Sequence, residues 1–252
     1  MKLGEGASDA PTVLFFVHVP KCAGSSFRAV IRGWYGDDAL FIETHDPAAL
    51  AEAFHDRPRP PKAIAGHMPF GLHGALPCKP LYVSLVRHPL DRLISLYKHT
   101  RNVADHSLHE AASRMDLQDF YDFSLENPRA RRQIVGIQCY FLSGERTFEQ
   151  ARARVDDAFA LVAPVGRYAE FEQACARKLG RPSMDGPTLN AGALIPGLGD
   201  TRDLLAGRAE RDFGEDLRLY QHVRDTFDAR CAQLDGDAGP ESLKRPSISP
   251  RA

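Results

Sequence analysis

The chain has 252 residues, with 32 lysines and arginines against 33 aspartates and glutamates, so its formal net charge at pH 7 is −1. This length is enough for one α/β domain with a full hydrophobic core. A charge so close to zero argues against a protein that binds nucleic acid without selectivity. The five cysteines are widely spaced without a Cys-x-x-Cys pair, which argues against a disulfide scaffold or a zinc motif and fits a reducing compartment.

The two ends of the chain differ from its middle. Residues 1–11 are small and polar, and residues 236–252 have little hydrophobicity, so we predict that both segments are disordered. Residues 12–235 are expected to form a single domain. No apolar segment follows Met1 and no run approaches the length of a transmembrane helix, so we expect a cytoplasmic protein without a membrane span.

The first element is a strand that turns sharply into a helix. Within Val13–Ser26, VLFFVHVPKCAGSS, an apolar strand at Val13–Val19 ends in a short loop. A helical pattern follows over Ser26–Tyr35, with apolar residues spaced at i, i+3, i+4 and i+7. Such a turn presents unpaired N–H groups and the positive end of the helix dipole to whatever lies in the loop.

The residue types in this loop suit an anion. Lys21 supplies a cation, Gly24 lets the backbone approach a ligand, and Ser25 and Ser26 supply hydroxyl donors and a candidate N-cap. Lys21 precedes the glycine, so the loop differs from the nucleoside-triphosphate motif G-x-x-x-x-G-K-[ST]. We predict a site for a phosphate or sulfate ester; the alternative is an ordinary strand–turn–helix with a solvated lysine.

A second strand also ends at a cation. In Leu81–Tyr97, LYVSLVRHPLDRLISLY, the strand Leu81–Val86 stops at Arg87, and a helical pattern covers Leu90–His99. The planar guanidinium of Arg87 suits a phosphate because it can bind two oxygens at once.

The remaining pattern also alternates strands with helices. The other expected strands are Ala63–Ala65 and Ala160–Pro164. The other expected helices are Pro47–Phe54, Leu117–Ser124, Ala130–Leu142, Phe148–Ala153, Tyr168–Leu179 and Arg211–Ala232. Pro182–Leu205 is expected to be a long loop. The alternation predicts an α/β fold with a central parallel sheet flanked by helices, and ligands at the carboxyl ends of its strands.

Both motifs resemble elements of the carbohydrate sulfotransferases. HVPKCAGSS resembles the family's 5′-phosphosulfate loop, His-Ile-Pro-Lys-Thr-Ala-Gly-Thr-Ser, and VRHPLDRLISLY resembles its 3′-phosphate element. The resemblance implies a P-loop-like nucleotide-binding sulfotransferase fold, 3′-phosphoadenosine 5′-phosphosulfate (PAPS) as donor, the bisphosphate PAP as product, and no metal. The donor-binding residues that it implies are Lys21, Cys22, Ala23, Gly24, Ser25, Ser26, Arg87 and Ser95, with Lys21 also stabilising the leaving group.

The chain departs from the family pattern at several places. Cys22 has no hydroxyl where the family has threonine, and His88 replaces an aspartate. Arg92 is expected to pair with Asp91 or a nearby glutamate rather than with the donor. Three further stretches resemble later family elements, namely Leu161–Gly180, Thr188–Ala193 and Asp216–Tyr220. The lid contacts near Asn190–Arg202 are left open.

Sulfuryl transfer also needs a general base, for which histidine is the usual choice. His67, in AIAGHMPFGLH, follows a short strand in a stretch similar to the one that carries the catalytic histidine of heparan sulfate and uronyl 2-O-sulfotransferases. We therefore expect His67 to be the base, with a strand-capping histidine as the alternative. His73 is a weaker candidate, and His18 is expected to be structural.

The acceptor is the least defined part of the sequence. Six arginines between Arg129 and Arg154 either face an acidic sugar or form an exposed helical face, and the resemblance alone implies a saccharide hydroxyl. Tyr121, Tyr140 and Phe141 could stack on a sugar ring, but their spacing favours the core. Two rival functions are a catalytically inactive nucleotide- or glycan-binding protein and an ATP-dependent small-molecule kinase. The oligomeric state is left open.

Overall fold

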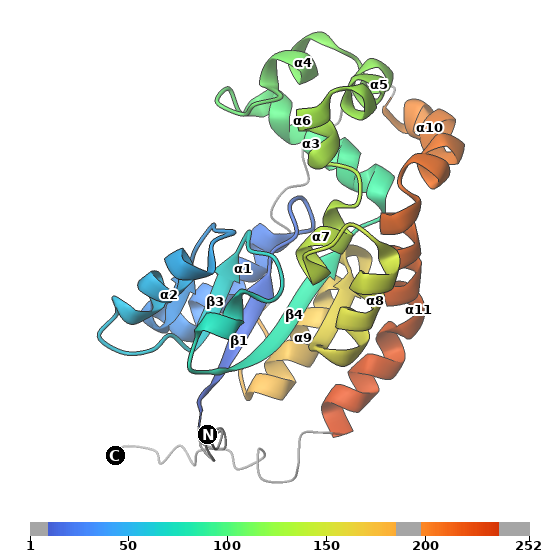
Figure 1. Cartoon of the computed structure of the whole chain (residues 1–252). Coiled ribbons are helices and arrows are strands. Elements are labelled where there is room, and N and C mark those ends of the chain that lie inside the picture. Colours follow the sequence, from blue (N-terminus) through green and yellow to red (C-terminus); the bar gives the residue numbers. More distant parts are fainter. Residues whose placement is uncertain (1–9, 185–197, 237–252) are drawn as a thin grey trace, which may run out of the picture.

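Five parallel strands form one sheet in the order β2-β3-β1-β4-β5 (Figure 1). The computed structural model describes residues 10–184 and 198–236. The strands are β1 Thr12–Val17, β2 Ala39–Phe41, β3 Ala63–Gly66, β4 Lys79–Val86 and β5 Phe159–Pro164. All four expected strands are present with ends within two residues of those expected, whereas the three-residue β2 carries too short a pattern to be recognised. The predicted α/β fold is confirmed.

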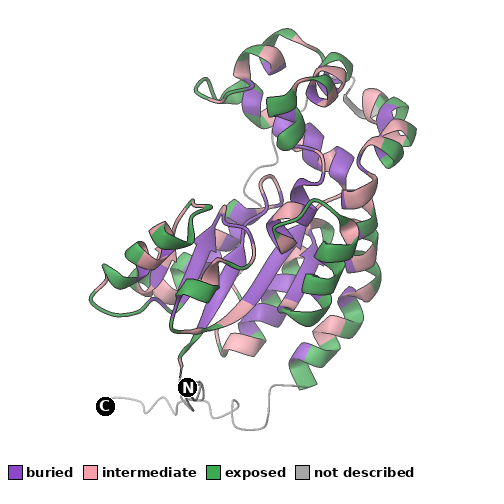
Figure 2. Cartoon of the chain, viewed as in Figure 1, coloured by how far each residue is buried: buried purple, intermediate pink, exposed green. Residues whose placement is uncertain are grey.

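The central strand β1 explains why the sheet is parallel and covered by helices. Its residues Val13–Val17 are all apolar and at most 1% exposed, which is the pattern of a strand buried on both faces (Figure 2). β1 pairs with β3 through Phe15 and Ile64, and with β4 through Phe15 and Tyr82. The carboxyl ends of these three neighbouring strands therefore meet at one edge of the sheet.

Helices flank this sheet and form a second layer beyond its carboxyl edge (Figure 1). The α-helices are α1 Gly24–Tyr35, α2 Pro47–His55, α3 Pro89–Asn102, α4 His109–Arg114, α5 Leu117–Glu126, α6 Pro128–Arg132, α7 Ile137–Ser143, α8 Phe148–Asp157, α9 Tyr168–Leu179, α10 Leu198–Asp212 and α11 Gly214–Gly236. Short 3-10 turns occupy Gly36–Asp38, Leu72–Ala75 and Val165–Arg167.

Four expectations about the helices need correction. The expected helix Ala130–Leu142 is two helices: α6 ends at Arg132, and Gly136, with a left-handed φ of 63°, is the N-cap of α7. The expected loop Pro182–Leu205 is helical from Leu198 onward, and α4 was not expected. The helix expected at Arg211–Ala232 begins at Gly214 instead. The predicted lid residue Asn190 and the predicted disordered ends, apart from residues 10, 11 and 236, lie outside the described residues.

The buried apolar side chains form two clusters. The larger one surrounds the sheet and includes Phe15, Phe27, Phe171 and Phe227. The smaller one lies in the helical layer of α3–α6 and α10, around Phe120. Helix α3 connects the two layers, since it begins directly after β4 and continues into the helical layer (Figure 1).

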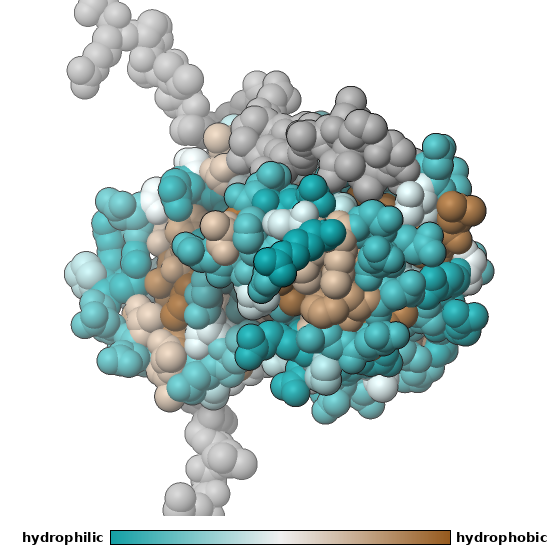
Figure 3. Space-filling view, turned by 90° about the horizontal axis from the view of Figure 1, so that it is seen from above, coloured by the Kyte–Doolittle hydropathy of each residue, from teal (hydrophilic) through white to brown (hydrophobic). Residues whose placement is uncertain are grey.

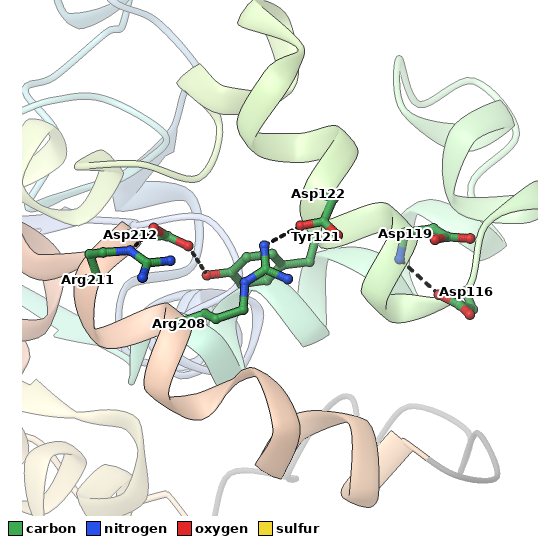
Figure 4. Close-up of polar contacts among 7 residues, drawn as sticks. All are labelled: Asp116, Asp119, Tyr121, Asp122, Arg208, Arg211 and Asp212. Carbon is green, nitrogen blue, oxygen red and sulfur yellow. Dashed lines mark hydrogen bonds and ion pairs between the residues drawn. The ribbon is translucent and has the colours of Figure 1, made fainter.

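Polar contacts fasten α10 to the helical layer (Figure 4). The Tyr121 hydroxyl of α5 donates to Asp212 at 2.7 Å, and Arg208 pairs with Asp122. Arg202, the nearest cation to the predicted lid, pairs at 2.7 Å with Asp91 of α3. Asp91 therefore has a different partner from the expected Arg92.

The outer surface of this layer is mostly hydrophilic when viewed from above (Figure 3). Among the described residues, Val103 and Leu204 are the only large hydrophobic side chains that are exposed. No helix in the described part of the chain is both long and apolar enough to cross a bilayer.

One buried carboxylate joins the C-terminal helix to α7. Asp216 of α11 is 0% exposed and accepts hydrogen bonds from the backbone N–H groups of Ile137, Gln138 and Cys139, each at 3.1 Å. These are the first amides of α7, which have no acceptor within their own helix. The carboxylate therefore supplies what the helix itself lacks.

We predict that Asp216→Ala lowers the free energy of unfolding by about 3 kcal/mol or more, because three buried N–H groups lose their acceptor. Urea denaturation measures this change. The control is Asp225→Ala, an exposed residue of the same helix that pairs with Arg224, and its effect should stay within about 0.5 kcal/mol. Similar unfolding midpoints for the two variants would contradict the prediction.

Candidate active site

A cavity of about 1080 Å³ opens at the carboxyl ends of the strands and extends to the helical layer. This volume is at the upper end of the range typical of small-molecule sites. Eight of the nine site residues expected from the sequence line it, seven of them around the strand ends: Lys21, Ala23, Gly24, Ser25, Ser26, Arg87 and His67. Ser95 also lines it, from α3, whereas Cys22 lies behind the wall. The topology thus brings the two cationic motifs and His67 into one space.

The loop after β1 has an unusual backbone. Lys21 and Ala23 adopt left-handed φ angles of 68° and 56°, which residues with a Cβ rarely do. Ala23 is the N-cap of α1, and the helix begins at Gly24, so the expected N-cap role of Ser25 and Ser26 is wrong. Backbone of this kind is typical of anion-binding loops, because it turns successive N–H groups toward one point.

Gly24 is required by a close contact within the protein. A Cβ at this position would lie 1.8 Å from Cδ2 of the His18 ring. From the sequence this glycine is expected to let a ligand approach the backbone, but its first physical role is to leave room for His18. The His18 ring in turn stacks on His67, with centroids 4.0 Å apart.

The side chain of Gln138 connects the two cationic motifs. Its Oε1 accepts hydrogen bonds from the Arg87 backbone N–H at 2.8 Å and from the Cys22 thiol at 3.5 Å. Its Nε2 donates to the Arg87 carbonyl at 2.8 Å. Burial raises the pKa of the Cys22 thiol to about 12, so Cys22 stays a neutral donor. Sequence reasoning missed Gln138, because a single glutamine in an apolar helix gives no motif.

Arg92 has a structural role that the sequence did not reveal. It is 1% exposed and donates to the carbonyls of Gln133 at 2.7 Å and Pro20 at 3.5 Å. It therefore joins the loop after β1 to the segment between α6 and α7. The expected pairing with Asp91 is wrong, because the helix turns Arg92 toward the interior.

The His67 ring is held in place through one of its two nitrogens. Nδ1 lies 2.7 Å from the carbonyl oxygen of His18, which can only accept, so Nδ1 carries the proton. Nε2 is then the unprotonated nitrogen of the neutral ring, and His67 lines the cavity. The backbone N–H of His67 donates to Glu43 at 2.6 Å, which fixes the end of β3.

The wall beyond His67 contains residues that carried no clear sequence signal. His45 Nδ1 lies 3.0 Å from the Tyr140 hydroxyl, and the Arg146 guanidinium lies 5.1 Å from the centre of the Tyr140 ring. Of the three aromatics weighed earlier, Tyr140 and Phe141 line the cavity, whereas Tyr121 belongs to the core. Two of the six arginines, Arg132 and Arg146, also line the cavity. His99 and His106, residues of a polar stretch, do so as well.

The comparisons with known proteins agree with this geometry. The family model described as "Sulfotransferase family" matches residues 8–139, more than half of the 252 residues. The chain belongs to the sulfotransferase family. A comparison with curated proteins finds no match.

Two solved sulfotransferase structures are similar to this one. A crystal structure of a sulfotransferase from Alicyclobacillus acidocaldarius has a TM-score of 0.52 and 16% sequence identity, covering 88% of this chain and 99% of that one. A crystal structure of mouse sulfotransferase SULT7A1 complexed with PAP has a TM-score of 0.35 and 10% identity, covering 84% of this chain and 89% of that one. The similarity to the structure from Alicyclobacillus acidocaldarius shows that this chain has the same fold as that protein.

The electrostatics of His18 in this sulfotransferase differ from those of free histidine. Burial, and then the charges of His67, Arg28 and Lys21, lower the pKa of His18 to about 2. His18 is therefore neutral at any working pH. Since the unfolded chain takes up a proton at His18 near pH 6.5, it binds more protons than the folded chain between these two values.

We predict that the folded state loses stability as the pH falls below about 6.5, with His18 contributing up to about 1.4 kcal/mol per pH unit. Urea unfolding at pH 7.5, 6.5 and 5.5 measures this slope. His18→Phe keeps an aromatic ring in the stack and removes the titration, so its slope should be shallower. Equal slopes in the wild type and the variant would contradict the assignment.

Proposed function

We propose that this sulfotransferase moves the sulfuryl group of PAPS to a hydroxyl of a carbohydrate-type acceptor and releases PAP. The observation that carries the proposal is the convergence of Lys21, Arg87 and His67 on one cavity, from the ends of the neighbouring strands β1, β4 and β3. This arrangement supplies the two requirements of the reaction, namely cations for the donor's anionic groups and a base for the acceptor hydroxyl.

The residues at the donor end fit a ligand with two separate anionic groups. The N–H groups of Gly24 and Ser25 have no acceptor within α1, and Lys21 lies in the same loop, so this end suits the 5′-phosphosulfate. Arg87, which precedes α3, and Ser95, within α3, suit the 3′-phosphate. Gln138 sets the spacing between the two groups of residues, because it binds the backbone of Arg87 and the thiol of Cys22.

Lys21 is proposed to stabilise the leaving phosphate oxygen. Burial, and then the charge of Arg87, lower the pKa of Lys21, which marks an ammonium group with little water around it. A partly desolvated cation interacts more strongly with the charge that develops in the transition state. The ammonium keeps its proton and acts through charge alone.

His67 is proposed to take the acceptor's proton at Nε2. The Nδ1–H bond to the His18 carbonyl holds the ring in the tautomer that leaves Nε2 able to accept. The same bond orients the ring and favours the imidazolium that forms when the proton is taken.

The wall beyond His67 supports a ring-shaped acceptor with hydroxyl groups. The rings of His45 and Tyr140 are near-parallel, with centroids 5.9 Å apart, and Phe141 lies 6.2 Å from His67. Stacking surfaces and hydrogen-bonding side chains side by side suit a sugar, which has apolar faces and polar edges.

The five free cysteines fit a reducing compartment, and we propose that the enzyme acts in the cytoplasm.

Two observations bear on the rival functions. A magnesium-dependent kinase would need a carboxylate where β4 ends, but Arg87 and His88 follow this strand. An inactive binding protein would have no need for the Nε2 of His67, and only an assay of transfer separates it from an enzyme.

We predict that PAP binds with micromolar affinity, whereas ATP with magnesium binds much more weakly. Arg87→Ala should weaken PAP binding about 10- to 100-fold, because a charged donor to the 3′-phosphate is lost. Isothermal titration calorimetry measures both. Arg129→Ala is a matched control, since it removes the same charge from an exposed residue that does not line the cavity. Preference for magnesium ATP would replace the sulfotransferase proposal with the kinase.

A second prediction concerns turnover on a panel of saccharides with PAPS as donor. His67→Ala should lower kcat by about 10²- to 10⁴-fold with PAP affinity unchanged, because it removes the base. Lys21→Ala should lower kcat by about 10²- to 10³-fold.

The control for the base is His73→Gln. His73 lies outside the cavity lining, and its Nδ1 bonds to the Tyr82 hydroxyl at 2.6 Å, so kcat should stay within about twofold. Near-normal turnover of His67→Ala would show that another group is the base. PAP binding without transfer to any saccharide would favour the inactive binding protein.

A further inference from the structure

The lining of the cavity is divided by charge. Its lysine and arginine side chains come from the loops after β1 and β4, from α3, and from the segment between α6 and α8: Lys21, Arg87, Arg92, Arg132 and Arg146. The α9 end is different. Among the described lining residues, Glu172 of α9 is the only carboxylate, and its neighbours there include Val165, Gly166 and Ala169, which carry no charge. A phosphate or sulfate would be repelled from this end, so an uncharged part of a ligand belongs there.

Glu172 is held firmly in the wall. It is 2% exposed, and it accepts hydrogen bonds from the Ser183 hydroxyl at 2.6 Å and the Met184 N–H at 2.9 Å. The segment that supplies these donors is fixed by Trp34, whose indole N–H donates to the Pro182 carbonyl at 2.9 Å. Two accepted bonds leave the carboxylate with further lone-pair positions.

A purely structural role does not account for the charge of this residue. A neutral glutamine could keep both contacts, with its Oε1 accepting from the Met184 N–H and its amide N–H donating to the Ser183 hydroxyl. Burying a carboxylate instead costs several kcal/mol of lost hydration. A carboxylate can only accept hydrogen bonds. Its charge is therefore useful where the wall must bind a ligand that donates hydrogen bonds and must reject a ligand that presents only acceptors. The cavity provides the space for such a ligand beside Glu172.

We propose that Glu172 recognises the nucleobase of the donor by accepting a hydrogen bond from the exocyclic amino group of adenine. This inference rests on the proposed function, since it takes the donor to be an adenosine bisphosphate derivative. Adenine presents an N6 amino donor, whereas guanine and hypoxanthine present an O6 acceptor at the same place. An O6 oxygen against the Glu172 carboxylate would leave two acceptors facing each other without a proton between them. The base would lie at α9, and the phosphates at the ends of β1 and β4.

The test compares adenosine 3′,5′-bisphosphate with inosine 3′,5′-bisphosphate by calorimetry. The two ligands have the same phosphates and ribose and differ only in the edge of the base. Wild-type protein should prefer the adenine ligand by about tenfold or more, as expected for a hydrogen bond to a charged group. Glu172→Gln should reduce this preference to within about twofold, because an amide can accept from N6 or donate to O6.

Two further variants separate recognition from packing. Glu170→Gln changes an exposed carboxylate on the same helix, one that pairs with Arg167 and does not line the cavity, so the preference should remain. Ser183→Ala removes an internal partner of Glu172 and keeps its charge, so the preference should also remain. Melting temperatures verify that each variant is folded. If Glu172→Gln does not fold, Ser183→Ala and the wild-type preference decide the question.

The outcomes are distinct. Loss of the adenine preference in Glu172→Gln alone supports the inference. Equal wild-type affinity for the two ligands, an unchanged preference in Glu172→Gln, or loss of the preference in Ser183→Ala would overturn it and leave Glu172 as a packing residue. If neither bisphosphate binds to the wild-type protein, the proposed function itself fails.

Discussion

The hydrogen bonds from the first amides of α7 to the buried carboxylate of Asp216 fix the position of Gln138, and the site depends on that position. Gln138 forms hydrogen bonds with both the backbone N–H and the carbonyl of Arg87, and with the thiol of Cys22. The loop after β1 and the loop after β4 thereby keep one relative arrangement, although each comes from a different strand. A donor with two anionic groups needs this fixed spacing, because binding it to a preformed site avoids the cost of ordering the loops. Helix α11 thus supports the proposed donor site, although none of its residues is among the described residues that line the cavity.

The strained loop is supported in the same way by its surroundings. Left-handed φ angles at Lys21 and Ala23 cost free energy, which the contacts around the loop must offset. Arg92 holds the carbonyl of Pro20, and the His18 ring occupies the space over Gly24. The neutral His18 also offers its carbonyl to His67. The loop after β1 and the proposed base are therefore parts of one packed unit.

The sequence predicted the sheet and both cationic motifs, because each rests on a local pattern. An apolar run that ends at a loop with Lys21, or at Arg87, can be recognised without knowledge of the rest of the chain. The sequence could not predict which polar residues support these two motifs. Gln138, Asp216 and Glu172 lie on three different helices, and their roles depend on contacts across the fold. The break at Gly136 was missed for a related reason, since a single glycine within an apolar pattern does not reveal its φ angle.

The two separate hydrophobic clusters have a consequence for how this enzyme can diversify. The loops after β1 and β4 belong to the sheet and its core, whereas His99, His106 and Arg132 extend into the cavity from the helical layer. Substitutions in that layer can therefore reshape one wall of the cavity while the packing under the donor loops stays as it is. The proposed donor loops pack with the sheet, as do the acceptor-wall residues Tyr140 and Phe141, so the wall from the helical layer is packed apart from both. Under the proposed function, changes in α4–α6 can alter which acceptors fit while the proposed donor residues, which include Ser95 of α3, stay in place.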